Sequence, residues 1–380
     1  MTTSEPDFAR SLDAADPLAI YRKQFIIPKR DGMELVYFLG NSLGLQPGNT
    51  RTAIDAVLEQ WAHYGVEGFF QGEQPWMNLH DRLTGPLSSI VGALPHEVVV
   101  MNQLSVNLHL MLVSFYRPHG KRNKIICEAK AFPSDQYVLE THIKHLGLDP
   151  QEVIVEVKPR PGSYIIDEED VLEVIEKHHD DVALVLWGGV NYYTGQLFNI
   201  RNITAAAHRA GAIAGFDLAH AAGNVPLELH NWDVDFACWC SYKYLNSGPG
   251  AVAGTFVHER YHTDSDIKRF GGWWGYNKAK RFKMEPGFDP VQSAEGWQLS
   301  TPAMLLYASH LAALEVFEAA GVDAIFAKSA KLSAYLYDEL ADISRAVGTR
   351  KLRLLTPPAA SARGSQVSML VQTNGRHVFE

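Results

Sequence analysis

The sequence has little cysteine. Its 380 residues include three, Cys127, Cys238 and Cys240. An odd count without regular spacing excludes a disulfide framework, and the C-x-C at 238–240 lacks the second cluster that a zinc site needs. Free cysteine behaves as a small buried hydrophobe, so we expect all three to be structural. Reduced thiols fit a cytoplasmic protein.

Long apolar runs are also missing. Nowhere do about 18 apolar residues follow one another, and residues 1–25 contain no apolar segment. We therefore expect neither a membrane-spanning helix nor a secretory signal. The net charge of -9 argues against a nucleic-acid partner, because a mildly acidic surface does not attract phosphates. With 46% hydrophobic residues, the chain is long enough for a large domain and a smaller one.

Short apolar runs alternate with helical patterns through the middle of the chain. The runs at 98–100, 124–127, 153–155 and 182–187 each precede a helical pattern, at 106–116, 134–146, 167–178 and 203–210, and further runs cover 212–216 and 236–240. This alternation predicts an α/β fold with a mostly parallel central sheet and helices on both faces. Such sheets bind ligands beyond the carboxyl ends of their strands.

Helical patterns flank this region on both sides. We expect an apolar stripe at helical spacing to face the core; it consists of Ile54, Val57, Leu58, Trp61 and Tyr64. The chain turns helical again from Pro302, and the stretch 356–365, rich in Pro, Ala and Ser, predicts a loop. We expect a large domain at 50–310 and a small domain formed by 1–49 with 311–380.

Two charged residues follow apolar runs in an informative order. Asp217 comes directly after AIAGF, and Lys243 comes after FACWCSY and before a small-residue loop at 247–250. A lysine amine can form a Schiff base with an aldehyde cofactor. A carboxylate can keep the pyridine nitrogen of that cofactor protonated, so that the ring accepts electrons. The pair therefore predicts a pyridoxal 5'-phosphate (PLP) site.

Four other residues could belong to the same site. His220, three residues after Asp217, could pack over the ring or be structural. Tyr242 could bind phosphate, move a proton or lie in the core. Ser105 opens a helix and could bind phosphate or simply cap that helix. Phe132 could stack on the ring or belong to the core.

Seven segments in order resemble kynureninase, within the class V group of PLP enzymes. They are FLGNSLGLQP (38–47), QLSVNLH (103–109), AFPSDQY (131–137), YYTGQLFNI (192–200), the long stretch 215–250, GGWWG (271–275) and RFKMEPGFDP (281–290). The resemblance runs from about residue 20 to 320. It implies the PLP-dependent transferase fold of aspartate-aminotransferase type I, with a smaller α+β domain, and homodimers with active sites at the subunit interface.

The resemblance also implies an activity and a set of site residues. The activity is PLP-dependent hydrolysis of L-kynurenine or 3-hydroxykynurenine to anthranilate or 3-hydroxyanthranilate and L-alanine, in tryptophan catabolism and NAD biosynthesis. Lys243 and Tyr242 are the expected catalytic residues, Trp273 is expected to reach over from the partner subunit, and no metal is expected. The expected cofactor-binding residues are Leu104, Ser105, Phe132, Pro133, Ser134, Asp135, Gly188, Asp217, His220, Tyr242, Lys243, Trp273 and Thr301.

The sequence departs from the family pattern at several places. Ser105 replaces a threonine and keeps the hydroxyl, whereas Gly188 replaces a serine and loses one. Thr301 replaces an amide that could bond a 3-hydroxyl, which favours unsubstituted kynurenine. The family continues into a segment with an arginine that clamps the substrate carboxylate. This chain stops at Glu380, and Arg376 is the nearest candidate, with a surface charge as the alternative.

Two other functions stay open. An aminotransferase of the same class would share the ring-binding residues, whereas a cysteine desulfurase needs a reactive cysteine late in the chain. The last cysteine here, Cys240, precedes the lysine. A protein lacking the terminal arginine could also be a catalytically weak PLP-binding dimer partner.

Overall fold

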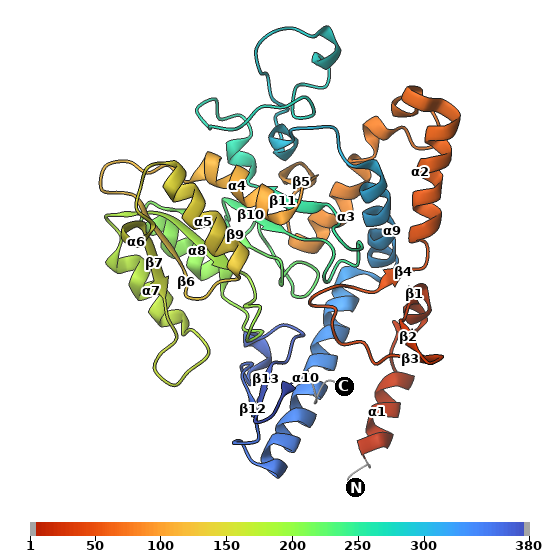
Figure 1. The fold of residues 1–380 in the computed structure, drawn as a ribbon, viewed down its shortest axis with the longest axis vertical. Coiled ribbons are helices and arrows are strands. Elements are labelled where there is room, and N and C mark those ends of the chain that lie inside the picture. The colour runs from red at the N-terminus through yellow and green to blue at the C-terminus, as the bar shows by residue number, and fades with distance from the viewer. Residues whose placement is uncertain (1–4, 376–380) are drawn as a thin grey trace.

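The central sheet is built from the apolar runs in the middle of the chain. The computed structural model describes residues 5–375 (Figure 1). The sheet has seven strands in the order β5-β11-β10-β9-β8-β6-β7. Neighbours from β10 to β7 pair in parallel, which confirms the predicted sheet. The strands are β5 (Val98–Met101), β6 (Lys124–Glu128), β7 (Ile154–Val157), β8 (Val182–Gly188), β9 (Ile213–Asp217), β10 (Phe236–Trp239) and β11 (Ala253–Val257).

Strand β11 is an addition to the predicted elements. It runs antiparallel to both of its neighbours, β10 and β5. All five of its residues are buried, so the apolar run AGTFV carried a strand signal that the alternation of runs and helices did not use. Because β11 returns beside β10, the loop that carries Lys243 is tied down at both ends.

Helices cover both faces of the sheet. The first face packs against α3 (Asp81–Val91), α7 (Glu168–Lys177), α8 (Ile200–Arg209) and α9 (Met304–Ala320), and the second against α4 (Leu104–Phe115) and α5 (Pro133–His145). Strand β5 shows how the period of two divides the core: Val98 and Val100 belong to the first layer, and Val99 and Met101 to the second. Burying each such side chain stabilises the fold by about 1.5–3 kcal/mol.

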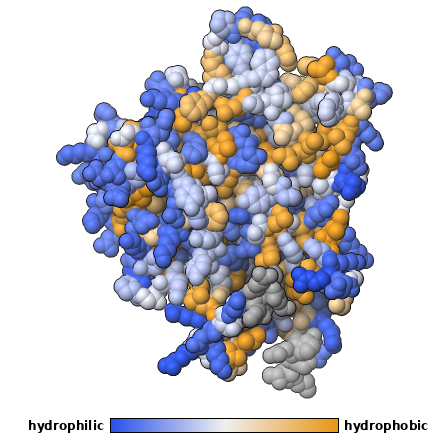
Figure 2. Space-filling view, viewed as in Figure 1, coloured by the Kyte–Doolittle hydropathy of each residue, from blue (hydrophilic) through white to orange (hydrophobic). Residues whose placement is uncertain are grey.

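The prediction for the upstream helix is wrong in part. Helix α2 (Thr50–Tyr64) forms at the expected place and packs against α9. Leu58 is 40% exposed and Trp61 is 63% exposed, so the stripe does not face the core as a whole. The helix covers α9 with one flank only, and periodicity alone does not say what each flank of a helix contacts. Apolar surface is visible at the upper right of Figure 2, where α2 lies in Figure 1.

The first and the last described elements of the chain lie at the same end of the molecule. Figure 1 places α1 (Glu5–Ala14) beside the long helix α10 (Val322–Val347). Strands β12 (Leu352–Leu354) and β13 (Met369–Val371) pair antiparallel next to α10. Between them, the predicted loop 356–365 contains one short 3-10 turn (Ala360–Ala362). Among the described residues we find no helix long and apolar enough to span a bilayer.

The remaining elements are short. Two small ribbons pair β1 (Phe25–Ile26) with β4 (Gln46–Pro47) and β2 (Lys29–Arg30) with β3 (Met33–Glu34). Helix α6 (Pro150–Val153) and eight 3-10 segments connect the larger elements: Ala19–Gln24, Gly65–Phe69, Trp76–Asn78, Pro95–Glu97, Glu259–Tyr261, Arg281–Lys283, Ala294–Trp297 and Ala360–Ala362. The division into domains at 50–310 and at 1–49 with 311–380 stays a prediction.

Candidate active site

A cavity of about 320 Å³ opens at the carboxyl ends of the central strands. Ten of the thirteen predicted cofactor-binding residues line it: Leu104, Ser105, Phe132, Ser134, Asp135, Gly188, Asp217, His220, Tyr242 and Lys243. Residues more than 130 positions apart in the chain meet here because parallel strands present their carboxyl ends at one edge. The remaining lining residues are Gln103, Glu128, Val190, Tyr192 and Ala219.

Lys243 lies in this cavity on the loop after β10. It is 8% exposed, and its Nζ donates to Nε2 of His220 at 2.8 Å. Burial, together with the charge of Lys243, lowers the pKa of His220 to about 3, so the imidazole is neutral and can accept this bond. The other ring nitrogen, Nδ1, is buried without a hydrogen-bond partner among the described residues. Lys243 therefore presents a nearly desolvated amine to the cavity.

Two carboxyl groups share the floor of the cavity. Asp217 is the last residue of β9, and its Oδ1 accepts from the backbone N–H of Ala219 at 2.7 Å. Burial raises the pKa of both Asp217 and Asp135, and the shift is larger at Asp135, which also feels the charge of Asp217. The two carboxyls are hydrogen-bonded to each other, which requires a proton on one of them, and the larger upward shift in pKa favours Asp135 as the donor. This arrangement leaves Asp217 free to face a positively charged ring nitrogen.

Aromatic and phenolic groups close the cavity. The ring centroid of Phe132 lies 5.6 Å from Nζ of Lys243, and its side chain is 46% exposed, so one face is open to stacking. Burial raises the pKa of Tyr242 to about 12, with a contribution from Cys240. Its phenol is therefore protonated at neutral pH and available as a proton donor.

The phosphate end of a cofactor would meet α4. Gln103 and Leu104 stand at the start of this helix, and Ser105 follows in its first turn. The free backbone N–H groups of a helix N-terminus and a nearby hydroxyl form an anion site. Ser134, in the first turn of α5, adds a second hydroxyl to the cavity lining.

Three predicted residues lie outside the cavity lining. Pro133 starts α5 next to the lining residues Phe132 and Ser134. Trp273 is 40% exposed and packs its ring against Phe282 at 5.7 Å. Thr301 lines a separate cavity of about 210 Å³ that shares Gln103 with the first. Arg376 falls outside the described residues 5–375.

The sequence reasoning missed Glu128 and Tyr192. Glu128 ends β6, so the same rule that selected Asp217 at the end of β9 could have selected it. Tyr192 belongs to a segment that resembles the family, but its contacts depend on the tertiary structure. Its ring lies 5.2 Å from that of Phe132, edge to face, at the side of the cavity.

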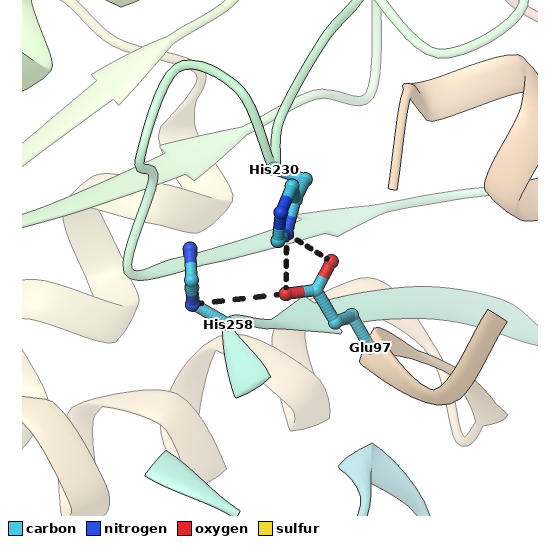
Figure 3. Close-up of side chains that lie close together, drawn as sticks. All are labelled: Glu97, His230 and His258. Carbon is cyan, nitrogen blue, oxygen red and sulfur yellow. Dashed lines mark hydrogen bonds and ion pairs between the residues drawn. The ribbon is translucent and has the colours of Figure 1, made fainter. Parts of the chain in front are cut away.

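A second polar cluster lies at the opposite edge of the sheet. Glu97, before β5, meets His230 and His258, with the candidate ligand atoms within 4.8 Å of one another (Figure 3). Such a set could hold a metal ion, but its geometry does not favour one. The two rings lie within 20° of parallel, and Nδ1 of His258 already accepts from the N–H of Arg260, so the lone pairs do not converge.

The contacts of Glu97 are those of a closed hydrogen-bond network. Its carboxylate accepts from the backbone N–H groups of Leu94 and Glu259, both at 2.9 Å, and contacts Nδ1 of His230 at 3.0 and 3.1 Å. A further group consists of His80, Asp81 and Glu295. The ammonium of Lys278 lies 2.9 Å from Glu295 and 3.6 Å from Asp81, so a cation of this chain already neutralises the carboxylates of that group.

The observed cavity fits PLP in several respects. An amine that can bind an aldehyde, a carboxylate for the ring nitrogen, an open aromatic face and a helix N-terminus surround one space. His220 Nδ1 is a buried polar atom that lacks a partner there. Fold and site together define a PLP-dependent enzyme of the class V aminotransferase type.

Comparisons with known proteins agree with this class. The aminotransferase class-V family model matches residues 151–373. A cystine C-S lyase solved with cysteine persulfide has a TM-score of 0.74 at 19% identity, covering 90% of this chain and 86% of its own. A cysteine desulfurase from Thermococcus onnurineus has a TM-score of 0.70 at 18% identity, covering 97% and 84%. At this identity the likeness concerns the fold alone.

Curated relatives are closer in sequence. A kynureninase of Flavobacterium johnsoniae is 54% identical over 374 residues, which are 98% of this chain and 88% of the relative. A kynureninase of Myxococcus xanthus is 51% identical over 363 residues, 95% of this chain and 84% of the relative. The chain belongs to the kynureninase family.

Proposed function

We propose that this protein hydrolyses L-kynurenine to anthranilate and L-alanine with PLP as cofactor, as part of tryptophan catabolism. The observation that carries the proposal is the placement of Lys243 and Asp217 at one cavity, in a chain about half identical to curated kynureninases over nearly its full length. A 3-hydroxykynurenine substrate would give 3-hydroxyanthranilate. By the family resemblance, Thr301 replaces the amide for that hydroxyl, which favours unsubstituted kynurenine; in the structure Thr301 lines the neighbouring cavity that shares Gln103.

Lys243 is the proposed covalent anchor and base. When bound, PLP supplies an aldehyde that links to amines and a ring that accepts the electrons released at the substrate's Cα. Nζ of Lys243, next to a neutral imidazole, can carry the cofactor and later take the proton from Cα. Asp217 would stabilise the positive charge on the ring nitrogen, and Asp135, hydrogen-bonded to Asp217, would keep that carboxylate in place. Phe132 would pack on one face of the ring.

Tyr242 is the proposed proton donor. Water adds to the side-chain ketone of kynurenine, the Cβ–Cγ bond breaks, and the three-carbon product needs a proton at Cβ. The phenol of Tyr242 lies next to Lys243 in the chain, and both line the cavity. With its pKa raised by burial to about 12, the phenol keeps its proton until a strongly basic carbon forms.

The desulfurase alternative has little support from the thiols. All three cysteines are buried, and burial raises the pKa of each, to about 11 for Cys240. A thiol in that state is a poor nucleophile, because the thiolate is the reactive form. The same buried, unpaired thiols support our proposal of a cytoplasmic protein.

The homodimer is likewise a proposal. Exposed aromatic side chains gather where Phe70 packs against Phe282 at 5.8 Å and Phe282 against Trp273 at 5.7 Å. A partner subunit would cover this surface and bring Trp273 near the phosphate end of a neighbouring site. Light scattering of the purified protein tests it, and a monomer at all concentrations would contradict it.

The activity is tested with PLP-loaded protein and L-kynurenine, by the fluorescence of released anthranilate. We expect turnover by the parent and a loss of at least about 1,000-fold in Lys243→Ala, because the covalent anchor and the base are removed together. Lys177→Ala, at an exposed position on α7, serves as the control and should be unaffected. A PLP-loaded parent that releases no anthranilate would refute the proposed activity.

A further inference from the structure

The carboxyl group of Glu128 is a buried acid that the proposed mechanism does not use. Glu128 is 6% exposed and lines the same cavity as Lys243. Its Oε2 accepts from Nδ2 of Asn191 at 2.8 Å. Its Oε1 points at Gly188, where an added Cβ would lie only 2.6 Å away. Glycine at 188, where the family pattern has serine, therefore leaves the room that Glu128 fills.

Asn191 links Glu128 to the turn 191–196 by hydrogen bonds. Its side-chain Oδ1 accepts from the backbone N–H groups of Tyr193 and Thr194 and from the hydroxyl of Thr194, at 2.8 to 3.0 Å. Its backbone N–H and C=O bond Gln196 and Gly195. A single side chain thus organises the whole turn 191–196, and its amide nitrogen is held by Glu128.

The turn carries Tyr192 and also joins the cavity to the C-terminal part of the chain. The ring of Tyr192 lies 5.2 Å from Phe132, edge to face. Its carbonyl accepts from Nε2 of Gln366 at 2.8 Å, and the carbonyl of Thr194 accepts from the hydroxyl of Thr356 at 2.6 Å. The turn is therefore fixed from the sheet on one side and from residues 356–366 on the other.

We propose that Glu128 is a positioning residue that, through its bond with Asn191, holds the turn 191–196 and Tyr192 beside Phe132 in the cavity lining, and thereby sets the affinity for the aromatic substrate. This inference rests on the proposed function. A carboxyl that accepts a hydrogen bond without needing charge can do this in its neutral form. Consistent with that, burial raises the pKa of Glu128 to about 7, and nearby Asp217 adds to the shift.

The test compares Glu128→Gln, Glu128→Ala, Asn191→Ala and the double alanine variant in the PLP-loaded protein. Gln keeps the acceptor for Asn191, so we expect KM within about twofold of the parent. Each single alanine variant should raise KM for L-kynurenine about tenfold and leave kcat within about threefold. The reason is that Tyr192 is no longer held in the cavity lining, while Lys243 stays in place. The double variant should also raise KM about tenfold, since both changes break the same bond between Glu128 and Asn191.

Glu97→Gln is the matched control, because Glu97 is also a buried glutamate but lies at the opposite edge of the sheet. It should change neither KM nor the dissociation constant for PLP, which is measured on the apo-protein by absorbance. If Glu128→Ala does not fold, Asn191→Ala breaks the same bond from its other side. The proposal is overturned if both single alanine variants keep the parental KM, or if Glu128→Gln raises KM as much as Glu128→Ala does. It is also overturned if the two alanine changes are additive, so that the double variant raises KM about 100-fold.

Failure of the proposed function can be told apart from failure of this inference. If the parent binds PLP but does not turn over kynurenine, the activity proposal falls. The same four variants are then compared by the dissociation constant for kynurenine, measured from the absorbance of bound PLP. A tenfold weakening that Gln restores supports the positioning role, and an unchanged constant overturns it.

Discussion

Both edges of the central sheet hold buried carboxyl groups, but the two edges differ in how many positively charged or hydrogen-bonding partners these carboxyls have within the chain. At the carboxyl edge, Glu128, Asp135 and Asp217 face a cavity with a single ammonium, that of Lys243. At the amino edge, Glu97 and Asp235 are matched within the chain. Asp235 is bonded by His208 at 2.8 Å and by Arg260 at 3.0 Å.

The pKa directions follow this difference. Burial raises the pKa of all three carboxyls at the carboxyl edge. At the amino edge, burial also acts to raise the pKa of Asp235, but the bonds from His208, Ala214 and Tyr261 hold it below its ordinary value. The carboxyl edge therefore leaves carboxyl groups available to a charged ligand. At the amino edge, the partners of the carboxyl groups come from the chain itself and stabilise the fold.

Removing Glu97 should give the largest change in free energy. Glu97→Ala leaves two backbone N–H groups and His230 without their acceptor, and the expected loss is about 3–5 kcal/mol in the free energy of unfolding. Urea denaturation measures it, with Glu97→Gln as the milder variant. A normal stability, or a change in PLP affinity of the folded fraction, would break the proposed separation of the two edges.

Paired aspartate variants sharpen the comparison. Asp217→Asn should lower kynurenine turnover by about 100-fold to 1,000-fold, since the partner of a developing charge is lost. Asp235→Asn, at a buried aspartate that directly precedes β10 at the amino edge, should lower stability and leave the turnover of folded protein unchanged. The measurement is the steady-state rate of each variant, corrected for its folded fraction. Equal losses of turnover in the two variants would contradict the assignment of Asp217 to the active site and of Asp235 to stability.

The apo-protein should lose stability as the pH rises from about 4.5 to 7, in part because of Glu128. Its pKa is raised in the folded state, so its contribution is present below the ordinary value of 4.5 and is lost as pH rises through about 7. The difference is on the order of 1–3 kcal/mol. Relative to the parent, Glu128→Gln should therefore gain stability between pH 5 and pH 8 in thermal melts. A difference in melting temperature between Glu128→Gln and the parent that stays constant from pH 5 to pH 8 would contradict the raised pKa of Glu128.

The smallest expected effect concerns His208. The bond to Asp235 raises its pKa, so its contribution is complete below the ordinary value of 6.5 and is lost as pH rises through the raised value. We expect about 1 kcal/mol, measured as a fall in melting temperature between pH 6 and pH 9 that is weaker in His208→Gln. Identical pH profiles for the parent and the variant would exclude this role.

Much of the site could be predicted because it follows local rules. Asp217 and Lys243 stand at strand ends, and the sheet type was readable from apolar runs separated by helical patterns. Glu128 obeys the same rule at the end of β6 but lies in no charged motif, so it was passed over. The part played by Asn191 depends on side-chain contacts to residues 63 positions away, which no local pattern encodes.

For helix α2, the sequence predicted the helix but not which of its residues are buried. Its helical spacing was predicted correctly, but Leu58 and Trp61 are exposed because they lie away from the flank that packs against α9. The sequence by itself predicted the parallel part of the sheet with its helices, the family resemblance and the pair Lys243 and Asp217, since these depend on residue type and spacing along the chain. Only the tertiary structure decided which buried carboxyls are compensated, because a buried charge is governed by whichever groups the fold brings within hydrogen-bonding distance of it.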